Sequence, residues 1–515
     1  MRHLEIAVVI ANLLAFVAVV VPRLRTFRGT PYVVFLAPWV AVVQGVVEGT
    51  RWAMISAYLL SGILLGVWVV QHLAPRTGFL PQPIARRSLA WIAVTAAILD
   101  LGLSIMLPTL LPVFQIPLPD GPYQIGTTTY HWVDANRHEI FSTDPLADRE
   151  LMAQIWYPVK GDTSSLRAAY AQDANALTGA LGHDFHVPGF LLDALNHVTT
   201  DAIPGAPVAK EAPSYPILIF SSGLMGYRQS NTFQVEDLVS HGFIVVTLDQ
   251  PYAAATTVFP DGHQILGWTR DHMQPLIQQS LNPMTPPPTL NGHVLPQGII
   301  PYFAQDIRFA LDQLTALNGN DPHGLFTGRL EMQHVGVFGI SLGAMVASEA
   351  CHEESRIKAC LMMDAAMPAD VVQAGLPQPS IWLTRPASDM EREGWAAADI
   401  VQTLTTMHSV FIREPAGNGY YVAIAGMFHI NFTDGAAFTP LGALWTPPLT
   451  GPIAAQRGFA IVNAYSLAFF EQTLTGRSPA LLSGPSHQFP EVDFTTSSAG
   501  HETSAPHINK MSCDF

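Results

Sequence analysis

The stretch His334–Ala350, HVGVFGISLGAMVASEA, places a serine between two glycines directly after an apolar run. Its first part, HVGVFG, has the β-branched and aromatic residues of a buried strand, and LGAMVASEA after the serine contains good helix formers. A sharp turn between a strand and a helix strains the central residue, and small residues at Gly339 and Gly343 let the two elements approach closely. Ser341 is therefore predicted to stand at the tip of a tight strand-to-helix turn.

Short apolar runs recur after about residue 119 and predict a sheet. Helix-like stretches such as 301–317 lie between several of these runs, and this alternation predicts an α/β class with a mostly parallel sheet covered on both faces. Residues 161–212 and 261–298 fit the alternation poorly and are expected to be cap-like insertions in a body spanning 119–485, followed by a polar tail over 486–515. The expected strands are LMAQIWYPV (151–159), YPILIFSS (215–222), FIVVTLD (243–249), HVGVFGIS (334–341), KACLMMDAA (358–366), PSIWLTR (379–385) and GYYVAIAG (419–426).

The first 118 residues differ from the body in hydropathy. The mean hydropathy of the whole chain is +0.25, which is high for a soluble protein. A cleaved signal peptide would account for the first apolar run alone, and runs such as AMISAYLLSGILLGVWVV lack the polar face of a buried core helix. We therefore predict an all-α transmembrane region of about four spans, each close to the roughly 20 residues that cross a bilayer. The apolar runs lie at roughly 4–22, 31–48, 53–74 and 88–114.

Charge placement predicts how these spans are oriented. Two loops rich in arginine follow the first and third runs and are expected in the cytoplasm, so the body after residue 118 should be extracytoplasmic in an integral membrane protein that contacts lipids through its N-terminal helices. An extracytoplasmic site would permit a bridge between Cys351 and Cys360, although their spacing alone does not show one. Asp100, inside the fourth run, is either a functional group or a residue that pairs within the bundle. The loop arginines are Arg23, Arg25, Arg28, Arg76, Arg86 and Arg87, against Arg2 and Arg51 on the other side.

The charge balance excludes one class of partner. Eight arginines and three acidic residues give residues 1–118 a formal charge of +5, which leaves −20 for the remainder of a chain with a net charge of −15. An acidic body repels phosphates, so we expect no nucleic acid partner. The sequence does not indicate an oligomeric state.

The G-x-S-x-G turn is the nucleophile elbow of α/β-hydrolases, in which an acid and then a histidine follow the serine along the chain. A serine hydroxyl needs such a base for activation, and the base needs an acid to orient it. His429 follows the last expected strand and begins the loop HINFTD, whereas His352 lies in or just beyond the elbow helix and His408 opens an expected strand. Asp364 and Asp389 both remain candidate acids, and the small-residue turn after ACLMMD favours Asp364 over the charged loop RPASDMERE.

The same chemistry needs two backbone N–H donors for the negative charge that develops on an attacked carbonyl. The residue after the nucleophile, Leu342, supplies one donor. The second is expected from ILIFSSGLMGYR (217–228), where Gly223 lets the backbone turn inward and makes Leu224 the candidate. We expect no metal or organic cofactor, because CHEES (351–355) is better explained as a solvated helix end.

Several ordered motifs resemble the platelet-activating-factor acetylhydrolase family, which includes the lipoprotein-associated phospholipase and many bacterial relatives. The resemblance runs from about residue 136 to 480. It implies an α/β-hydrolase fold and calcium-independent cleavage of short or oxidised acyl chains from phospholipids, or of simpler esters. The motifs are YPILIFSSGLMGYR, LVSHGFIVVTLDQP, VGVFGISLGA, ACLMMDAAMP and FHINFTD.

Carried over position by position, the resemblance implies roles for five residues. Ser341 matches the nucleophile, Asp364 the acid and His429 the base, which decides between the two candidate acids. Leu224 and Leu342 match the oxyanion donors. Two departures leave these positions intact: a serine replaces the histidine of the usual SHG motif, and GIS replaces GHS at the elbow.

We therefore expect a membrane-anchored serine ester hydrolase that cleaves short-chain acyl esters, including phospholipids, through an acyl-serine intermediate. The four-span region is absent from the best-known secreted family members, so the substrate is less constrained than the chemistry. The alternatives are a general carboxylesterase, lipase or cutinase-like polyester hydrolase and, more remotely, an inert hydrolase domain on a membrane sensor or transport component.

Overall fold

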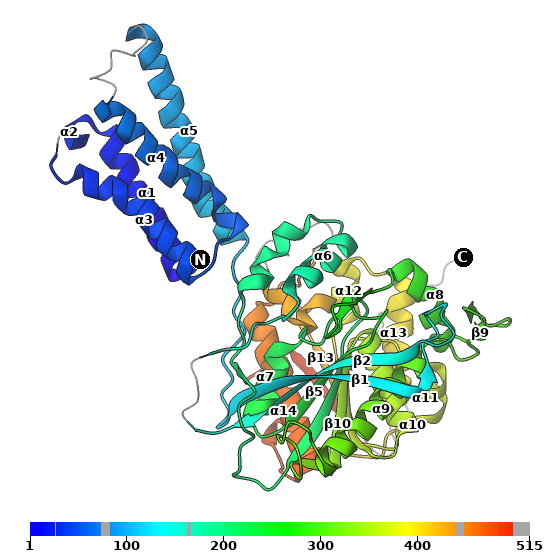
Figure 1. Ribbon diagram of the computed structural model, residues 1–515. Helices are drawn as coiled ribbons and strands as arrows, with labels where there is room; N and C mark the ends of the chain where they lie inside the picture. Colours follow the sequence, from blue (N-terminus) through cyan, green and yellow to red (C-terminus); the bar gives the residue numbers. More distant parts are fainter. Residues whose placement is uncertain (26, 74–82, 162–165, 439–447, 498–515) are drawn as a thin grey trace, which may run out of the picture. The chain divides into compact units, whose positions relative to one another are not determined.

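The computed structural model describes residues 1–25, 27–73, 83–161, 166–438 and 448–497 (Figure 1). The chain forms two compact units. The first comprises Met1–Gln115, Ala169–Thr199 and Ala437–Gly442, and the second Ile116–Ala168, Thr200–Ala436 and Ala443–Phe515. Residues 161–212 were expected as an insertion in the body, whereas Ala169–Thr199 group with the N-terminal helices.

The first unit is helical. Four of its helical stretches are long and apolar enough to cross a membrane, namely His3–Val20, Thr30–Val47, Trp52–His72 and Trp91–Leu110, which agrees with the four runs expected from the sequence. Asp100 lies on the last of them, where its backbone carbonyl accepts a 2.8 Å hydrogen bond from the Ser104 hydroxyl. Arg76 of the second basic loop lies outside the described residues. The helices are α1 (His3–Val20), α2 (Pro22–Arg25), α3 (Thr30–Val47), η1 (Trp52–Met54), α4 (Ile55–Leu73), α5 (Pro83–Leu110), α6 (Ala174–Asp184) and η3 (Gly189–His197).

Polar and aromatic contacts join the ends of these helices to the 169–199 segment. Arg51, just before η1, forms a buried ion pair of 2.7 Å with Glu5 of α1. The Trp52 N–H donates to Asp193 Oδ2 of η3 at 3.3 Å, and its ring centroid lies 4.6 Å from that of Phe190. The segment therefore contacts the N-terminal helices at Trp52, through one hydrogen bond and one pair of rings.

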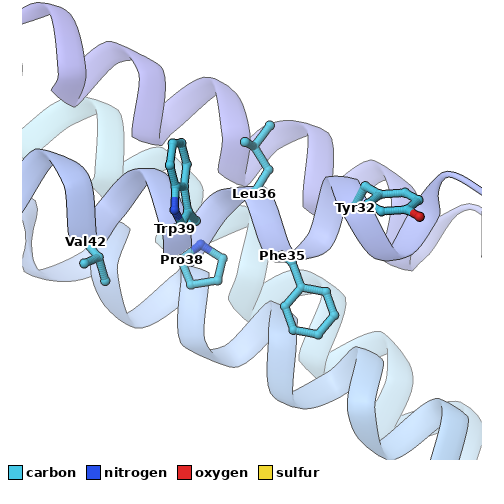
Figure 2. Close-up of a pocket in the computed structure, with 6 residues that line it drawn as sticks. All are labelled: Tyr32, Phe35, Leu36, Pro38, Trp39 and Val42. Carbon is cyan, nitrogen blue, oxygen red and sulfur yellow. The ribbon is translucent and has the colours of Figure 1, made fainter.

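One surface of α3 carries a shallow apolar pocket of about 520 Å³. Figure 2 shows the lining side chains on successive turns of this helix. Trp39 and Val42 are 64% and 65% exposed, and no lining residue is charged, which is typical of a helix surface that faces lipid. The lining residues are Tyr32, Phe35, Leu36, Pro38, Trp39 and Val42.

The second unit is built on a ten-stranded sheet in the order β14-β13-β12-β11-β10-β4-β5-β2-β1-β3. From β5 to β13 every neighbouring pair is parallel, while β1, β2 and β14 pair antiparallel with β2, β5 and β13 respectively. All seven expected strands are present, which confirms a mixed α/β class with a large, mostly parallel sheet. The strands are β1 (Gln124–His138), β2 (Asp148–Val159), β3 (Ala202–Pro204), β4 (Tyr215–Ser221), β5 (Ile244–Asp249), β10 (Leu330–Ile340), β11 (Ile357–Met363), β12 (Ser380–Thr384), β13 (Gly419–Ile424) and β14 (Val492–Thr496).

Helices cover both faces of the sheet because successive strand residues point in opposite directions. On β10, Val337 packs into the core shared with α9 and α10, whereas the Phe338 ring lies 6.0 Å from the Phe470 ring of α14. Figure 1 shows α9 and α10 on one side of the sheet and α14 with α7 on the other. The helices are α7 (Thr232–Ser240), α8 (Arg270–Leu281), α9 (Ile300–Gly319), α10 (Leu342–Glu353), α11 (Ala369–Ala374), α12 (Ala387–Glu393), α13 (Ala397–Phe411) and α14 (Ala455–Thr475).

Three details differ from the sequence-based expectations. His408 lies within α13 and does not open a strand. Residues 492–496 of the expected polar tail form β14 at the sheet edge, and 498–515 lie outside the described residues. The expected insertion 261–298 contains α8 and parts of two small hairpins, β6 (Thr256–Val258) with β7 (Gln264–Leu266) and β8 (Thr289–Leu290) with β9 (His293–Val294).

A disulfide joins Cys351 of α10 to Cys360 of β11 across a sequence separation of 9 residues. We expect the double substitution Cys351→Ala/Cys360→Ala to lower the free energy of unfolding by about 2–3 kcal/mol, because the bridge restricts the unfolded chain. Urea unfolding in detergent measures the loss. An unchanged free energy of unfolding in the double variant would contradict the expectation.

Candidate active site

Ser341 occupies the turn between β10 and α10 in a strained conformation, with φ 57° and ψ −124°. Its N–H donates to the Met363 carbonyl at 3.0 Å. A Cβ built on Gly339 would lie 2.2 Å from the Gly343 carbonyl oxygen, and one on Gly343 would lie 2.0 Å from the Ser221 carbonyl oxygen. Both flanking glycines are thus required by the close approach of strand, helix and neighbouring loop.

Asp364 and His429 meet at the carboxyl edge of the sheet, where β11 and β13 end. The His429 Nδ1 atom lies 2.7 Å from Asp364 Oδ2, the carboxylate is fully buried, and the imidazole side chain is 29% exposed. Burial acts to raise the pKa of the Asp364 carboxyl, but the Arg385 guanidinium and the His429 imidazole outweigh it and hold that pKa below its ordinary value. An ionised carboxylate therefore faces one nitrogen of a partly exposed imidazole.

Several hydrogen bonds hold the loop that contains His429 in place. The Asn431 side-chain oxygen accepts hydrogen bonds from the N–H groups of Phe428 at 2.9 Å and Gly451 at 2.8 Å. The buried Asp434 carboxylate accepts from the Thr232 N–H at 2.8 Å, at the start of α7. Because buried donors and acceptors on both sides are paired, the loop has a single well-defined conformation.

The expected oxyanion donors lie beside the elbow. A Cβ on Gly223 would lie 3.2 Å from Ser341 Cβ, so the loop after β4 packs directly against the serine. The Met225 N–H donates to the Ala253 carbonyl at 2.8 Å, which holds that loop in place. Within the described part of the chain, the N–H groups of Leu224 and Leu342 donate to no protein group.

Asp389, the other candidate acid, is not the solvated loop residue that the sequence suggested. It lies in the first turn of α12, is 5% exposed, and accepts a 2.7 Å hydrogen bond from the Gly426 N–H through Oδ2. Its carboxylate therefore stabilises the turn after β13, while Asp364 contacts the imidazole.

The structure adds two charged residues that sequence reasoning did not single out. Arg385, directly after β12, is fully buried and donates from Nε to Asp364 Oδ2 at 2.9 Å. Glu393 of α12 pairs with the same guanidinium and accepts a 3.2 Å hydrogen bond from the His429 N–H. The one sequence signal was an arginine at the end of the apolar strand PSIWLTR, where a buried cation requires an anionic partner.

Glu349, buried on the helix that follows Ser341, predicts a pH-dependent stability. Burial, reinforced by Asp370, raises the pKa of Glu349 to about 9. The carboxyl is neutral in the folded chain and ionised in the unfolded chain at neutral pH, so stability falls as pH rises from the ordinary pKa of 4.5 towards 9. We expect the free energy of unfolding of Glu349→Gln to exceed that of the native chain by about 1–3 kcal/mol at pH 8. Near pH 4 this difference should disappear.

Urea unfolding of both proteins at several pH values checks this expectation. The exposed Glu391 provides a matched control, because Glu391→Gln removes the same charge without a buried environment. A stability difference for Glu349→Gln that does not change with pH would show that the buried carboxyl is ionised.

Sequence comparisons place the chain among known proteins. A family profile described as platelet-activating factor acetylhydrolase, isoform II, matches residues 111–267. A protein of Arthroderma benhamiae named probable 1-alkyl-2-acetylglycerophosphocholine esterase is 24% identical over 403 residues, covering 74% of this chain and 94% of the relative. The platelet-activating factor acetylhydrolase of Cavia porcellus is 23% identical over 367 residues, covering 70% of this chain and 78% of the relative. The chain is a relative of the platelet-activating factor acetylhydrolases.

A solved structure supports the same class. The ferulic acid esterase from Streptomyces cinnamoneus superposes on this acetylhydrolase relative with a TM-score of 0.56 and 26% identity, covering 74% of this chain and 99% of that one. The likenesses confirm the resemblance inferred from the motifs and the predicted enzyme class, a hydrolase of carboxylic ester bonds.

Proposed function

We propose that this acetylhydrolase relative is a membrane-anchored serine hydrolase that cleaves short-chain acyl esters, with the apolar helices within residues 1–118 as the anchor and the unit that contains the ten-stranded sheet as the catalytic domain. The 2.7 Å contact between His429 Nδ1 and Asp364 Oδ2, beside the strained Ser341 turn, carries the proposal. Such an arrangement supplies a nucleophile, a base and an orienting acid, in the chain order that is typical of the α/β-hydrolase fold.

In the proposed mechanism, His429 accepts the proton of the Ser341 hydroxyl through Nε2 as the serine oxygen attacks the ester carbonyl. Asp364 holds the opposite nitrogen and stabilises the imidazolium that forms. The N–H groups of Leu224 and Leu342 bind the oxyanion. His429 then protonates the leaving alcohol, leaving an acyl group on Ser341, and water activated by the same imidazole hydrolyses it. No step calls for a metal or an organic cofactor.

The substrate class follows from the relatives' names. Two relatives are named for acetyl esters of a glycerophosphocholine or of platelet-activating factor, which supports a short-acyl phospholipid as substrate. Four apolar helices would place the site near a lipid surface that presents such esters. The ferulic acid esterase neighbour favours a second candidate, a soluble aromatic or general carboxylic ester.

Hydrolysis of p-nitrophenyl esters from acetyl to dodecanoyl by detergent-purified protein tests the proposal. Serine-dependent activity that falls steeply beyond short chains is expected, and activity that persists on long chains would indicate a lipase. The same preparation should then hydrolyse 1-alkyl-2-acetylglycerophosphocholine faster than methyl ferulate; the reverse order would favour the second candidate. No activity on any ester would support an inert domain.

We further propose that the catalytic domain is extracytoplasmic. The basic loops predict it, and the Cys351–Cys360 disulfide is of a kind that persists in oxidising compartments. Protease added outside intact cells is expected to digest the catalytic domain. Complete protection, with digestion after permeabilisation, would place the domain in the cytoplasm.

A further inference from the structure

We propose that Arg385, Glu393 and Trp395 form a clamp that positions His429 and sets the pH range over which it acts as a base. This inference rests on the proposed role of His429. None of the three residues touches the reacting atoms in the proposed mechanism, so they are positioning residues.

Arg385 is the centre of the clamp. Its Nε atom lies 2.9 Å from Asp364 Oδ2, the same oxygen that lies 2.7 Å from His429 Nδ1. Its Nη1 atom pairs with the Glu393 carboxylate, and its side chain is fully buried. A buried guanidinium is costly unless it is paired, so its place between two carboxylates is a specific arrangement and not a solvated surface pair.

Glu393 closes a ring of contacts around the histidine. Both of its carboxylate oxygens lie within reach of the His429 backbone N–H, at 3.2 Å and 3.3 Å. One carboxylate therefore holds the imidazole of this residue and a second holds its backbone, and a single guanidinium ties the two together. Displacing the histidine would break contacts on both sides of the ring.

Trp395 contacts both Arg385 and His429. The Arg385 guanidinium carbon lies 4.8 Å from the centre of its ring, and the His429 ring centroid lies 5.4 Å away. A cation near an aromatic face is attracted to it, and the ring also restricts rotation of the imidazole. The clamp thus combines charge, hydrogen bonding and packing.

Charges of both signs lie around His429. Asp364 at the end of β11 and Glu393 on α12 are acidic, whereas Arg385 after β12 is cationic and pairs with both carboxylates. From β13, Tyr421 also faces the Asp364 charge, and burial followed by that charge raises the pKa of its phenol far above its ordinary value, so it stays neutral. Removal of the Arg385 charge and removal of the Glu393 charge should therefore change the electrostatic potential at the imidazole in opposite directions.

Two substitutions that each remove one charge test this idea. The measurement is the acid limb of the pH profile of kcat/KM, the pH range in which activity rises as the base of the free enzyme loses its proton. Arg385→Gln is expected to move the limb upward by about 1 pH unit, and Glu393→Gln to move it downward by about 0.5–1 unit. Arg385→Lys keeps the charge but loses the two-armed geometry, so we expect an unmoved limb with kcat about 10-fold lower. Arg392→Gln, an arginine 59% exposed on the same helix, is the matched control and should change neither quantity.

Labelling of Ser341 by a fluorophosphonate, followed against pH, separates the two proposals. Absence of labelling in the native chain would refute the proposed nucleophile and base. A second outcome is labelling of the native chain while the acid limbs of the Arg385→Gln and Glu393→Gln profiles move in the same direction or do not move. That result would overturn the proposed clamp. Thermal melts show whether each variant is folded; if Arg385→Gln does not fold, the downward shift in Glu393→Gln and the unmoved limb of Arg385→Lys still decide.

Discussion

Ser341→Ala is expected to lower kcat for a short-chain p-nitrophenyl ester by about 10⁵–10⁶-fold. Alanine removes the hydroxyl that is proposed to form the acyl intermediate, while the N–H groups of Leu224 and Leu342, the proposed oxyanion donors, remain. Water must then attack without a positioned nucleophile, so only the contribution of binding and oxyanion stabilisation survives. KM should change far less than kcat, because the substituted atom acts mainly in the transition state.

Steady-state kinetics on detergent-purified protein measures this loss. Ser348 lies on the same helix, is fully buried and donates to the Met345 carbonyl at 2.8 Å, so Ser348→Ala is a matched serine deletion away from the elbow. That control should retain activity within about threefold, because surface and scaffold changes away from the site act mainly on stability. Residual activity above 1% in Ser341→Ala would show that another group is the nucleophile.

Asp364→Asn should lower kcat by about 10⁴-fold at neutral pH. An amide nitrogen facing His429 favours the tautomer that places the proton on Nε2, where it cannot receive the proton of Ser341. The substitution also removes the charge that stabilises the imidazolium, and it leaves the buried Arg385 with one carboxylate partner in place of two. The loss should appear in kcat and kcat/KM alike.

Asp389→Asn is the informative control, because Asp389 was the competing candidate acid and is likewise buried. We expect it to lose less than about 10-fold, through a weaker hydrogen bond to the Gly426 N–H. A larger loss in Asp389→Asn than in Asp364→Asn would reverse the assignment. The native chain should also lose stability as pH falls through the lowered pKa of Asp364, a dependence that Asp364→Asn lacks.

The central strands were predictable because strands buried on both faces are continuous apolar runs. The runs that form β4, β5 and β10 are of this kind, and so are those that form β11 and β12. The strain at Ser341 was predictable for a related reason, since two glycines that permit close contact flank one serine. The local pattern of apolar residues was therefore sufficient to predict the strands that are buried on both faces of the sheet.

The outer strands were not predictable from the same pattern. The strand β1, QIGTTTYHWVDANRH, is largely polar and its last six residues lie at least partly in solvent, as do four of the five residues of β14. Polar residues on the exposed face of an antiparallel edge make such a strand look like a loop. His408 shows the converse, because an apolar neighbourhood suits a buried helix such as α13 as well as a strand.

The candidate site divides in the same way. The order of Ser341, Asp364 and His429 along the chain was enough to predict which residues are candidates, and their catalytic roles stay predictions. Arg385 and Glu393 could not be found by such reasoning, because an isolated arginine and a glutamate in a charged helix resemble surface residues until tertiary contacts bury them. Long-range ion pairs leave little trace in local sequence.

The grouping of residues 169–199 with the N-terminal helices affects how the enzyme can be shortened. A soluble fragment beginning at residue 119 would lack Trp52, which packs on Phe190, and Phe114, whose ring lies 5.2 Å from that of Tyr170. Removal of residues 1–118 would thus deprive the 169–199 segment of its packing partners and leave aromatic side chains in water, where they promote aggregation. A fragment without the N-terminal helices would therefore also require redesign of residues 169–199, a second and distant stretch of the same chain.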